Sequence, residues 1–246
     1  MSGQRIMVSV VSHAQNALVN QLVEDLATHC APGLKVIITE NVPDGEPLRL
    51  SQASHEFEII RNSEPKGFGA NHNAAFARCR SEFFCVANPD IRLPADPFGP
   101  LSATLSARRA GAIAPLVLSA QGSVEDSARR YPTLASLVRK AFTKGAKPDY
   151  ATDRGAIEVD WVAGMFMLFA TEAYRAVGGF DERYFLYYED VDICRRLRSR
   201  GYKVVYEPAV SVIHEARRAS RRNPRLMRIH AASALRYLLS RYPQRS

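Results

Sequence analysis

Short apolar segments alternate with helical segments through the first 90 residues of this 246-residue chain. Runs of apolar and β-branched residues predict four strands, at 6–11, 34–39, 56–60 and 83–87. Leu18, Leu22 and Leu26 recur at every fourth position, which predicts a helix over 16–29, and a second helix is expected over 71–80. Strands separated by helices need crossover connections, so they form a largely parallel sheet that is covered on both faces. The alternation therefore predicts an α/β fold.

The rest of the chain continues this mixture of helices and strands. The predicted elements are a helix at 97–109, a strand at 112–118, an apolar strand or buried segment at 161–170, helices at 171–177 and 190–199, short strands at 204–206 and 210–213, and an amphipathic helix at 224–239 with Leu226, Ile229, Ala232, Leu235, Leu238 and Leu239 on one face and arginines on the other. Two long stretches, 119–132 and 143–155, are predicted to be loops. Loops of this length in a compact domain are usually functional or mobile.

Composition excludes several classes of protein. The longest apolar run, 161–170, is about half of the roughly 18–20 residues that span a bilayer. The N-terminus has no apolar stretch that ends at a small-residue cleavage site, so we expect no signal peptide. The four cysteines lack the spacing of a zinc or thioredoxin-like site and are expected to be reduced and mostly buried. An integral membrane protein, an exported protein and a coiled coil are therefore not expected.

The net charge of +8 lies in the C-terminal segment. Residues 215–246 contain nine arginines and one acid, Glu215, whereas residues 1–214 are neutral overall. A neutral body with a basic tail predicts a local anionic partner such as a lipid surface, a diphosphate or nucleic acid. A solvated helix face remains the alternative.

Polar residues follow the predicted strands of the N-terminal half. Ser12, Glu40 and Asn88 each stand where an apolar strand ends. Ligands of such sheets bind at the carboxyl ends of the strands, so these positions predict a site. Asp90, in the segment NPD, is expected to project into the same crevice, where one carboxylate with substrate phosphates and water suffices for Mg²⁺ or Mn²⁺. Taken alone, the segment fits a type I turn better.

Three further segments carry residues suited to chemistry. In PKGFGANHNAAF (65–76), Lys66 and two glycines precede a helix and can bring backbone N–H groups toward a phosphate or base. Taken alone, the segment is better explained by glycine as a turn former. EDVD (189–192) places three acids beside aromatic residues, where desolvation raises a carboxylate pKa and suits a general base. Helix-dipole complementarity explains it as well. His214 follows a strand and is expected either to be structural or to complete a metal site with Asp90.

Taken together, six segments in this order resemble the inverting glycosyltransferases of family 2, especially the rhamnosyltransferase-like branch. They are VSVVSH (8–13), TEN (39–41), NSEPKGFGANHN (62–73), FCVANPDIRLP (84–94), WVAGMFMLFATEAYRAVGGFDERYFLYYEDVDICRRLRSRGY (161–202) and VSVIHEARRAS (210–220). The resemblance covers nearly the whole chain and is most specific over 161–202. Position 88 is Asn where the metal motif has Asp, and Glu40 stands where Asp is commoner.

The resemblance implies a GT-A fold: a Rossmann-like, mostly parallel central sheet flanked by helices. It implies a nucleotide-sugar-binding half at 1–95, an acceptor and catalytic half at 96–214 and a basic amphipathic tail at 215–246. The implied donor-binding residues are Ser12, Glu40, Lys66, Gly67, Phe68, Asn73, Asn88 and Asp90. By resemblance, Trp161 and Gly164 shape the sugar and acceptor side, Asp190 with Glu189 matches the catalytic base motif, and Asp90 stands at the end of the metal-binding motif. His214 is the residue expected to complete a site for Mg²⁺ or Mn²⁺ with Asp90. Arg217, Arg218, Arg221 and Arg222 are expected to contact diphosphate or another anion.

The function that follows is transfer of a sugar from a nucleotide-diphosphate donor, a dTDP- or UDP-sugar, to a glycan or lipid-linked saccharide. By resemblance, L-rhamnose from dTDP-rhamnose is the first expectation. We expect a cytoplasmic protein of cell-envelope polysaccharide biosynthesis, peripheral on the cytoplasmic face of the inner membrane through its C-terminal helix. The alternatives are a nucleotidyltransferase acting on a sugar phosphate and a non-enzymatic nucleic-acid binder. The neutral body and the lack of aromatic residues beside the arginines argue against nucleic acid.

Overall fold

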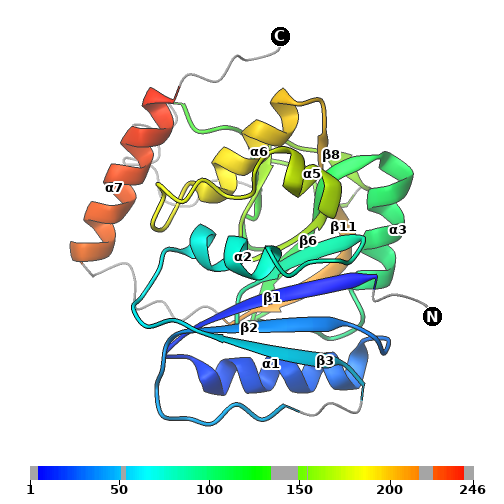
Figure 1. Ribbon diagram of the computed structural model, residues 1–246. Coiled ribbons are helices and arrows are strands. Elements are labelled where there is room, and N and C mark those ends of the chain that lie inside the picture. The colour runs from blue at the N-terminus through cyan, green and yellow to red at the C-terminus, as the bar shows by residue number, and fades with distance from the viewer. Residues whose placement is uncertain (1–4, 51–53, 134–148, 154, 216–223, 241–246) are drawn as a thin grey trace.

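The computed structural model describes residues 5–50, 54–133, 149–153, 155–215 and 224–240 (Figure 1). This part of the chain forms a nine-stranded sheet and a separate pair of strands. The sheet runs in the order β3 (Glu56–Arg61), β2 (Lys35–Val42), β1 (Ile6–His13), β4 (Phe83–Ala87), β10 (Phe166–Ala170), β6 (Ala110–Ser119), β11 (Lys203–His214) and β5 (Ile91–Arg92), with β8 (Ile157–Glu158) beside β11. The separate pair is β7 (Ala128–Arg129) and β9 (Trp161–Val162).

The predicted α/β fold is confirmed, and the sheet is mixed. Strands β1 to β4 pair in parallel, as do β6 and β11, whereas β10 lies antiparallel between β4 and β6. The predicted segment 161–170 is thus two strands, β9 and β10, with a connection over 163–165. The two short strands predicted at 204–206 and 210–213 are one strand, β11, whose register shifts between Glu207 and Ser211.

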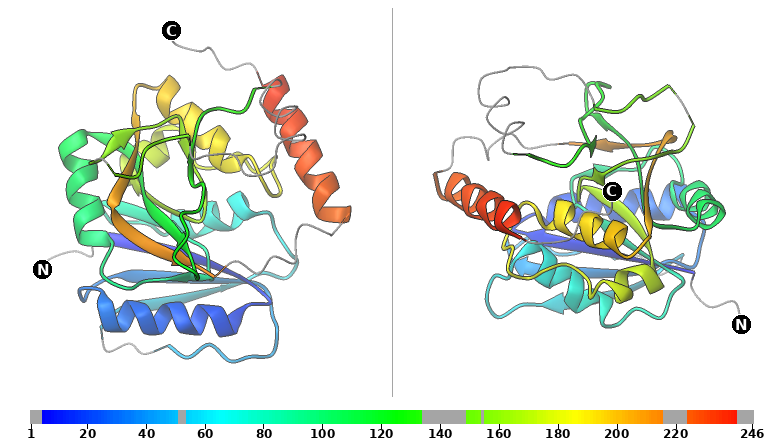
Figure 2. Two further views of the ribbon diagram at one scale, coloured as in Figure 1. Left: turned by 180° about the vertical axis from the view of Figure 1, so that it is seen from behind. Right: turned by 90° about the horizontal axis from the view of Figure 1, so that it is seen from above.

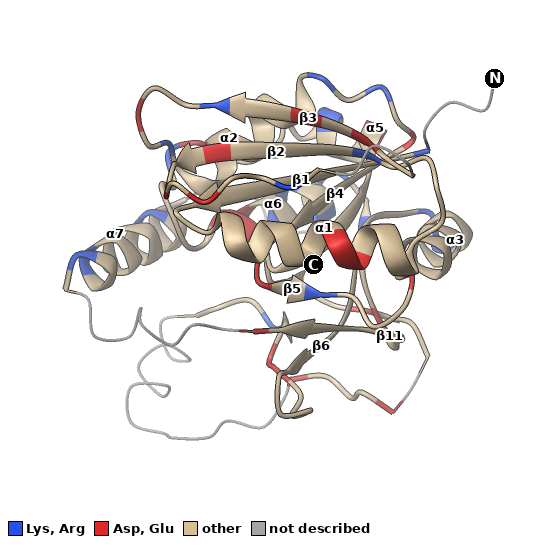
Figure 3. Cartoon of the chain, turned by 90° about the horizontal axis from the view of Figure 1, so that it is seen from below, with Lys and Arg blue, Asp and Glu red and all other residues tan. Residues whose placement is uncertain are grey.

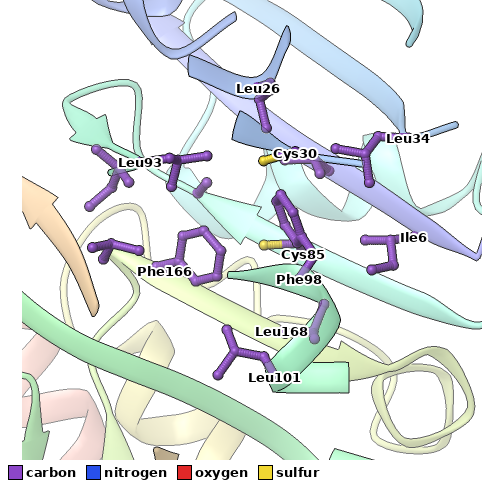
Figure 4. Packing of buried hydrophobic residues seen from close by; sticks show 14 of the residues in the cluster. Ile6, Leu26, Cys30, Leu34, Cys85, Leu93, Phe98, Leu101, Phe166 and Leu168 are labelled. Carbon is purple, nitrogen blue, oxygen red and sulfur yellow. The ribbon is translucent and has the colours of Figure 1, made fainter. Parts of the chain in front are cut away.

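Helices cover both faces of the sheet (Figure 2). On one face, α1 (Asn16–His29) and α3 (Phe98–Arg108) pack against every second residue of β1, β4 and β10, which include Val8, Cys85 and Leu168. Figure 4 shows this packing. On the other face, α2 (Phe68–Phe76), α5 (Thr171–Ala176) and α6 (Glu189–Ser199) cover the alternate residues. Because successive strand side chains point to opposite faces, these fully buried strands fill two cores.

The C-terminal helix, α7 (Pro224–Leu239), packs on the body in an orientation that the leucine pattern did not predict. Ser233 and Tyr237 are its buried residues, whereas Met227, Leu235 and Leu239 are exposed. Tyr237 packs on Tyr188, with 5.6 Å between ring centroids, and contact with this aromatic residue, remote in sequence, selects the buried face. Figure 3 shows Lys or Arg but no Asp or Glu on this helix. No helix within the described ranges is long and apolar enough to cross a bilayer.

Candidate active site

Polar residues from three parallel strands meet at one edge of the sheet. Ser12, Glu40 and Asn88 lie at or just after the carboxyl ends of β1, β2 and β4, which are neighbours in the sheet. Antiparallel β10 begins at the same edge, because its first residue, Phe166, pairs with Ala87 at the end of β4. The connection before β10, residues 163–165, therefore lies at this edge as well.

A hydrogen-bonded chain occupies the edge at β1 and β2. The Ser12 hydroxyl, fully buried, donates to Asn16 Oδ1 over 2.6 Å, and the amide nitrogen of Asn16 donates to Glu40 Oε1 over 3.1 Å. Arg61 binds the other carboxylate oxygen of Glu40 at 2.7 Å. Ser12 therefore orients Asn16, and Asn16 with Arg61 holds the carboxylate of Glu40. Asn16 and Arg61 were not predicted, because each is recognisable only once β2 is placed beside them.

The segment that carries Lys66 and Gly67 is held by asparagine side chains. Asn41 Oδ1 accepts a hydrogen bond from the Lys66 N–H at 2.8 Å, and the Asn41 amide donates to the Lys66 carbonyl at 3.0 Å. Asn62 links Asn41 to Asn71, and Asn71 donates to the Gly67 carbonyl. This network pins the backbone of Lys66 and Gly67 while the Lys66 side chain stays exposed.

Gly67 is required by a close approach of two backbones. A Cβ atom on Gly67 would lie 2.8 Å from the carbonyl oxygen of Phe185, and the same carbonyl accepts a hydrogen bond from the Phe68 N–H at 2.9 Å. A hollow of about 520 Å³ lies beside this contact and is lined by Pro65, Lys66, Gly67, Ala70, Asn73, Ala74, Glu182 and Phe185. The hollow does not include Asp90 or Asp190, so it is separate from the carboxylates described below.

Asn73 serves the protein's own structure. Its oxygen accepts hydrogen bonds from the Tyr174 hydroxyl and the Phe180 N–H, and its nitrogen donates to the Phe180 carbonyl and to Glu182. An amide offers two donors and two lone pairs, so all of its capacity is used. Asn73 therefore supports the turn before Glu182, and because it also lines the hollow described above, its place in the donor site stays a prediction.

Asp90 and His214 face each other across the end of the sheet. His214 Nε2 lies 3.3 Å from Asp90 Oδ2, and His214 Nδ1 lies 2.7 Å from Glu125 Oε2. Burial alone would lower the pKa of His214, but hydrogen bonds and charge from Asp90 and Glu125 outweigh it and raise the pKa to about 9. Glu125 was not predicted, since its segment reads as a loop and its partner is 89 residues away.

A divalent cation that also binds substrate phosphates would fit these two residues by displacing the proton from His214 Nε2, since only a neutral imidazole nitrogen binds a metal. Oδ1 of Asp90 is buried and has no hydrogen-bond partner among the described residues, so it is available to a metal ion. Glu125 holds His214 from its second ring nitrogen, as a carboxylate commonly does for a metal-binding histidine. Within the ranges described above, no group of three or more His, Cys, Asp or Glu side chains is suited to a metal. Mg²⁺ and Mn²⁺ tolerate so few protein ligands because water and phosphate complete their shell.

Asp190 lies in the first turn of α6 and is partly exposed. Its Oδ2 accepts a hydrogen bond from the Gly164 N–H at 3.0 Å, and its Oδ1 accepts one from the Val191 N–H at 2.8 Å. Desolvation raises the pKa of Asp190, while the two backbone donors oppose this by stabilising the carboxylate. The result is an oriented carboxylate whose proton affinity exceeds that of an ordinary aspartate.

The neighbouring Glu189 has a different environment. It is 5% exposed, and its Oε2 has no hydrogen-bond partner in the described part of the chain. Burial and the charge of Asp190 raise the pKa of Glu189 well above its ordinary value. Of the two adjacent acids, Asp190 is therefore the one whose carboxylate is stabilised by N–H groups of two other residues, Gly164 and Val191.

Asp190 and the strand end that precedes Asp90 are both hydrogen-bonded to the backbone of residues 164–165. The Asn88 N–H donates to the Met165 carbonyl at 2.9 Å, and the N–H of the preceding residue, Gly164, donates to Asp190. Asp90 follows Asn88 by two residues, so the connection before β10 brings both carboxylates to the same edge. A Cβ on Gly164 would lie 3.3 Å from the Phe68 ring and 3.7 Å from Asp190 Cβ. Gly164 thus allows the Phe68 segment and the acid to approach each other.

Trp161 borders this arrangement from β9. Its ring is 8% exposed, its Nε1 donates to the Arg130 carbonyl at 2.9 Å, and the Arg129 guanidinium lies 5.5 Å from the ring centroid. The positive charge of Arg129 also acts on Asp190, where it opposes the rise in pKa caused by desolvation. Arg129 was not predicted, because the strand pair that brings it to Trp161 is only two residues long on each side. The predicted anion contacts Arg217, Arg218, Arg221 and Arg222 lie outside the described residues.

Residues 4–229 match the family described as "Glycosyltransferase like family 2". The chain belongs to this family. A rhamnosyltransferase of Escherichia coli K12, WbbL, is 29% identical over 95% of this chain and 92% of its own length. The N-acetylglucosaminyl-diphospho-decaprenol L-rhamnosyltransferase of Mycobacterium tuberculosis H37Rv is 29% identical over 88% of this chain and 78% of its own. The protein is therefore a glycosyltransferase that is similar to rhamnosyltransferases.

Solved structures support the GT-A fold of this glycosyltransferase. Staphylococcus aureus TarS 1–349 with UDP-GlcNAc aligns with a TM-score of 0.67 at 13% identity, over 94% of this chain and 66% of that one. The mannosyltransferase PcManGT of Pyrobaculum calidifontis, with GDP-Man and Mn²⁺, gives 0.66 at 17% identity, over 96% and 65%. GalNAc-T7 with UDP, GalNAc and Mn²⁺ gives 0.65 at 14% identity, and this chain spans 44% of it. Membership in the family makes this protein a nucleotide-sugar glycosyltransferase.

Proposed function

We propose that this glycosyltransferase inverts the donor's anomeric centre and transfers L-rhamnose from dTDP-rhamnose to a lipid-linked saccharide. The observation that carries the reaction type is the delivery of Asp90 and Asp190 to one edge of the sheet by Asn88, Met165 and Gly164. The rhamnosyltransferases that align over most of the chain support the sugar, and the decaprenol-linked name of one of them supports the acceptor class.

Asp190 is the general base in this proposal. Its carboxylate, held by the Gly164 and Val191 N–H groups, takes the proton of the acceptor hydroxyl. The hydroxyl oxygen then bonds to the anomeric carbon from the face opposite the diphosphate. The bond from that carbon to the diphosphate oxygen breaks, the nucleoside diphosphate leaves, and the configuration inverts. A base with a raised pKa accepts the proton more readily once the hydroxyl begins to form its new bond. Glu189 lies buried beside it, and burial together with the charge of Asp190 raises the pKa of Glu189, which favours its neutral form.

Donor binding falls to the residues at the ends of β1, β2 and β4. Glu40, held by Asn16 and Arg61, faces the nucleoside, and the segment from Lys66 to Phe68 lies along the donor. Asp90 and His214 would hold Mg²⁺ or Mn²⁺ at the diphosphate, where a divalent cation neutralises charge that develops on the leaving group. Trp161 and Gly164 border the acceptor side.

A panel of sugar nucleotides tests the donor. Thermal unfolding is measured with dTDP-rhamnose, UDP-GlcNAc, UDP-galactofuranose, UDP-glucose and GDP-mannose, each with and without Mn²⁺. We expect the largest rise in Tm with dTDP-rhamnose and Mn²⁺, because a ligand that binds only the folded state stabilises it by RT ln(1 + L/Kd), where L is the free ligand concentration, and at equal concentration this is largest for the tightest ligand. dTDP alone is the control for nucleotide affinity. A larger rise with another sugar nucleotide contradicts the proposed donor while leaving the reaction type intact.

Association with an anionic membrane surface is the second part of the proposal. The outward face of α7 presents Met227, Leu235 and Leu239 at 58–71% exposure, and Arg225 and Arg228 are exposed on the same helix. A helix with apolar and basic residues on its free surface binds at the headgroup boundary, at roughly 1 kcal/mol per basic residue near the surface. A lipid-linked acceptor would be presented at that boundary.

Co-sedimentation with vesicles tests this association on the full chain. We expect binding to phosphatidylglycerol vesicles that salt weakens, and little binding to phosphatidylcholine vesicles. The double variant Leu235→Gln, Leu239→Gln should bind at least about tenfold more weakly, since a buried leucine contributes about 1.5–3 kcal/mol. Activity on a water-soluble acceptor is the control that shows an intact enzyme. Equal sedimentation of the variant and the parent protein contradicts the proposed membrane surface.

A further inference from the structure

The backbone directly before the acids of α6 adopts an unusual conformation. Tyr187 and Tyr188 have φ values of 70° and 69°, in the left-handed region that non-glycine residues rarely adopt. Tyr188 is also the N-cap residue of α6, so this turn sets the direction in which the helix starts. A conformation of this kind persists where surrounding contacts hold it. Asp190 is two residues further along and inherits its position from the turn.

One face of α7 contacts this turn. The Ser233 hydroxyl, which is 5% exposed, donates a hydrogen bond to the Leu186 carbonyl at 2.9 Å. The His230 ring lies 5.2 Å from the Tyr187 ring and 5.4 Å from the Tyr188 ring. Tyr237 adds its contact with Tyr188. Residues 230, 233 and 237 share one helix face, so a single helix holds the segment at three successive residues, 186 to 188. In Figure 1 and in the right-hand view of Figure 2, α7 lies beside the chain that leads into α6.

The same segment is fixed from the donor side. The Phe185 carbonyl accepts the Phe68 N–H, and Gly67 leaves no space for a side chain against it. Residues 185–188 are therefore clamped between the backbone that is proposed to line the donor and the C-terminal helix. Without α7, residues 185–188 would be held only from the donor side. Among the described contacts, no other group on the α7 side donates a hydrogen bond to the Leu186 carbonyl.

We infer that α7 is part of the catalytic machinery as a positioning element: Ser233 and His230 hold the left-handed turn at Tyr187 and Tyr188 so that the Asp190 carboxylate stays aimed at the acceptor hydroxyl. The inference rests on the proposed role of Asp190 as base. Ser233 and His230 touch neither reacting atom, so they act through the turn. The described contacts of Ser233 and His230 are with residues 186–188 and not with Glu40, Lys66 or Asp90, which separates this role from donor binding.

The variants Ser233→Ala and His230→Ala test the inference. Alanine favours helix, so neither substitution disfavours α7 by propensity. Ala231→Ser is the matched control, since it adds a hydroxyl to an exposed position of the same helix. We expect Ser233→Ala to lower kcat by about tenfold with the donor KM within about twofold of the parent value, because misplacement by 1 Å costs up to about 10²-fold. Ala231→Ser should match the parent enzyme.

Hydrogen exchange provides a readout other than activity. The peptide over 184–194 should exchange faster in Ser233→Ala and His230→Ala than in the parent protein or in Ala231→Ser. If both variants keep the parent kcat, the inference is overturned, whatever the exchange shows. An equal loss in Ala231→Ser also overturns it, since the effect would then belong to the helix in general. If the Asp190→Asn enzyme is active, the proposed base is wrong, and this is a failure of the proposed function. The exchange measurement still tests separately whether α7 holds the turn.

Discussion

Replacing Asp190 by Asn is expected to lower kcat by about 10²- to 10⁴-fold while donor affinity changes little. The range is that of a lost general base. Asparagine has nearly the same shape, and its oxygen keeps one of the two backbone hydrogen bonds, but it cannot take a proton. Steady-state kinetics with a soluble acceptor and calorimetry with the donor measure the two quantities separately.

Glu189→Gln is the matched control for this prediction. Glutamine resembles the protonated form of glutamate, which burial and the charge of Asp190 favour at this position. We therefore expect Glu189→Gln to keep kcat within about fivefold, in contrast to the loss for a proton-transfer group. An active Asp190→Asn enzyme, or an inactive Glu189→Gln enzyme beside it, moves the base away from Asp190.

The pH profile of the parent enzyme belongs to the same argument. A base works when it is deprotonated, so activity falls as the pH drops through its pKa. Because desolvation raises the pKa of Asp190, the acidic limb of kcat/KM should lie above the ordinary aspartate value of about 3.9. The two acids are adjacent and interact, so the limb reports the pair.

Replacing Asp90 by Ala is expected to abolish the part of donor affinity that depends on Mn²⁺. The buried oxygen Oδ1 has no partner among the described residues, and His214 lies against Oδ2, so the substitution removes the carboxylate that a cation would use. Loss of a residue that only supports a ligand costs about 10- to 100-fold in metal affinity, and loss of the ligand itself costs at least as much. Calorimetry with the donor, with and without Mn²⁺, measures the change.

Glu125→Gln distinguishes a residue that binds the metal, Asp90, from one that only holds the metal-binding His214. Glu125 contacts the far nitrogen of His214, so its loss should weaken Mn²⁺-dependent donor binding by about tenfold, less than the loss of Asp90. Donor affinity without the metal should be nearly the same in both variants. Unchanged Mn²⁺ dependence in Asp90→Ala contradicts the assignment of Asp90 to the cation.

The strand ends were predictable because their signal is local. An apolar run followed by a polar residue identifies Ser12, Glu40 and Asn88 without any knowledge of neighbours, and parallel pairing then brings them to one edge. Asn73 shows the limit of this reasoning. Its segment was recognised, but its four hydrogen bonds reach residues about a hundred positions away. Sequence spacing carries no information about such contacts.

The side of the last helix that packs on the protein was not predictable from the sequence. The leucine spacing predicts an apolar face, which we expected to lie on a membrane surface, but no residue pattern shows which side meets the rest of the protein. In the structure Ser233 and Tyr237 face the body while Leu235 and Leu239 remain outside. A tyrosine that stacks on Tyr188 and a hydroxyl that meets the Leu186 carbonyl define the buried side. Only the packed neighbour shows which side that is.

By itself, the sequence determined the α/β class, the order of most elements and the family, and it indicated Asp90 and Asp190 as candidates for the site, because periodicity and short motifs depend on residues near one another. Tertiary structure alone decided that β10 inserts antiparallel beside β4, that Gly164 and Met165 carry both acids to one edge, and that Glu125 supports His214. These features join segments that lie tens of residues apart or more. Backbone hydrogen bonding and burial select such pairings among many that a linear pattern equally permits.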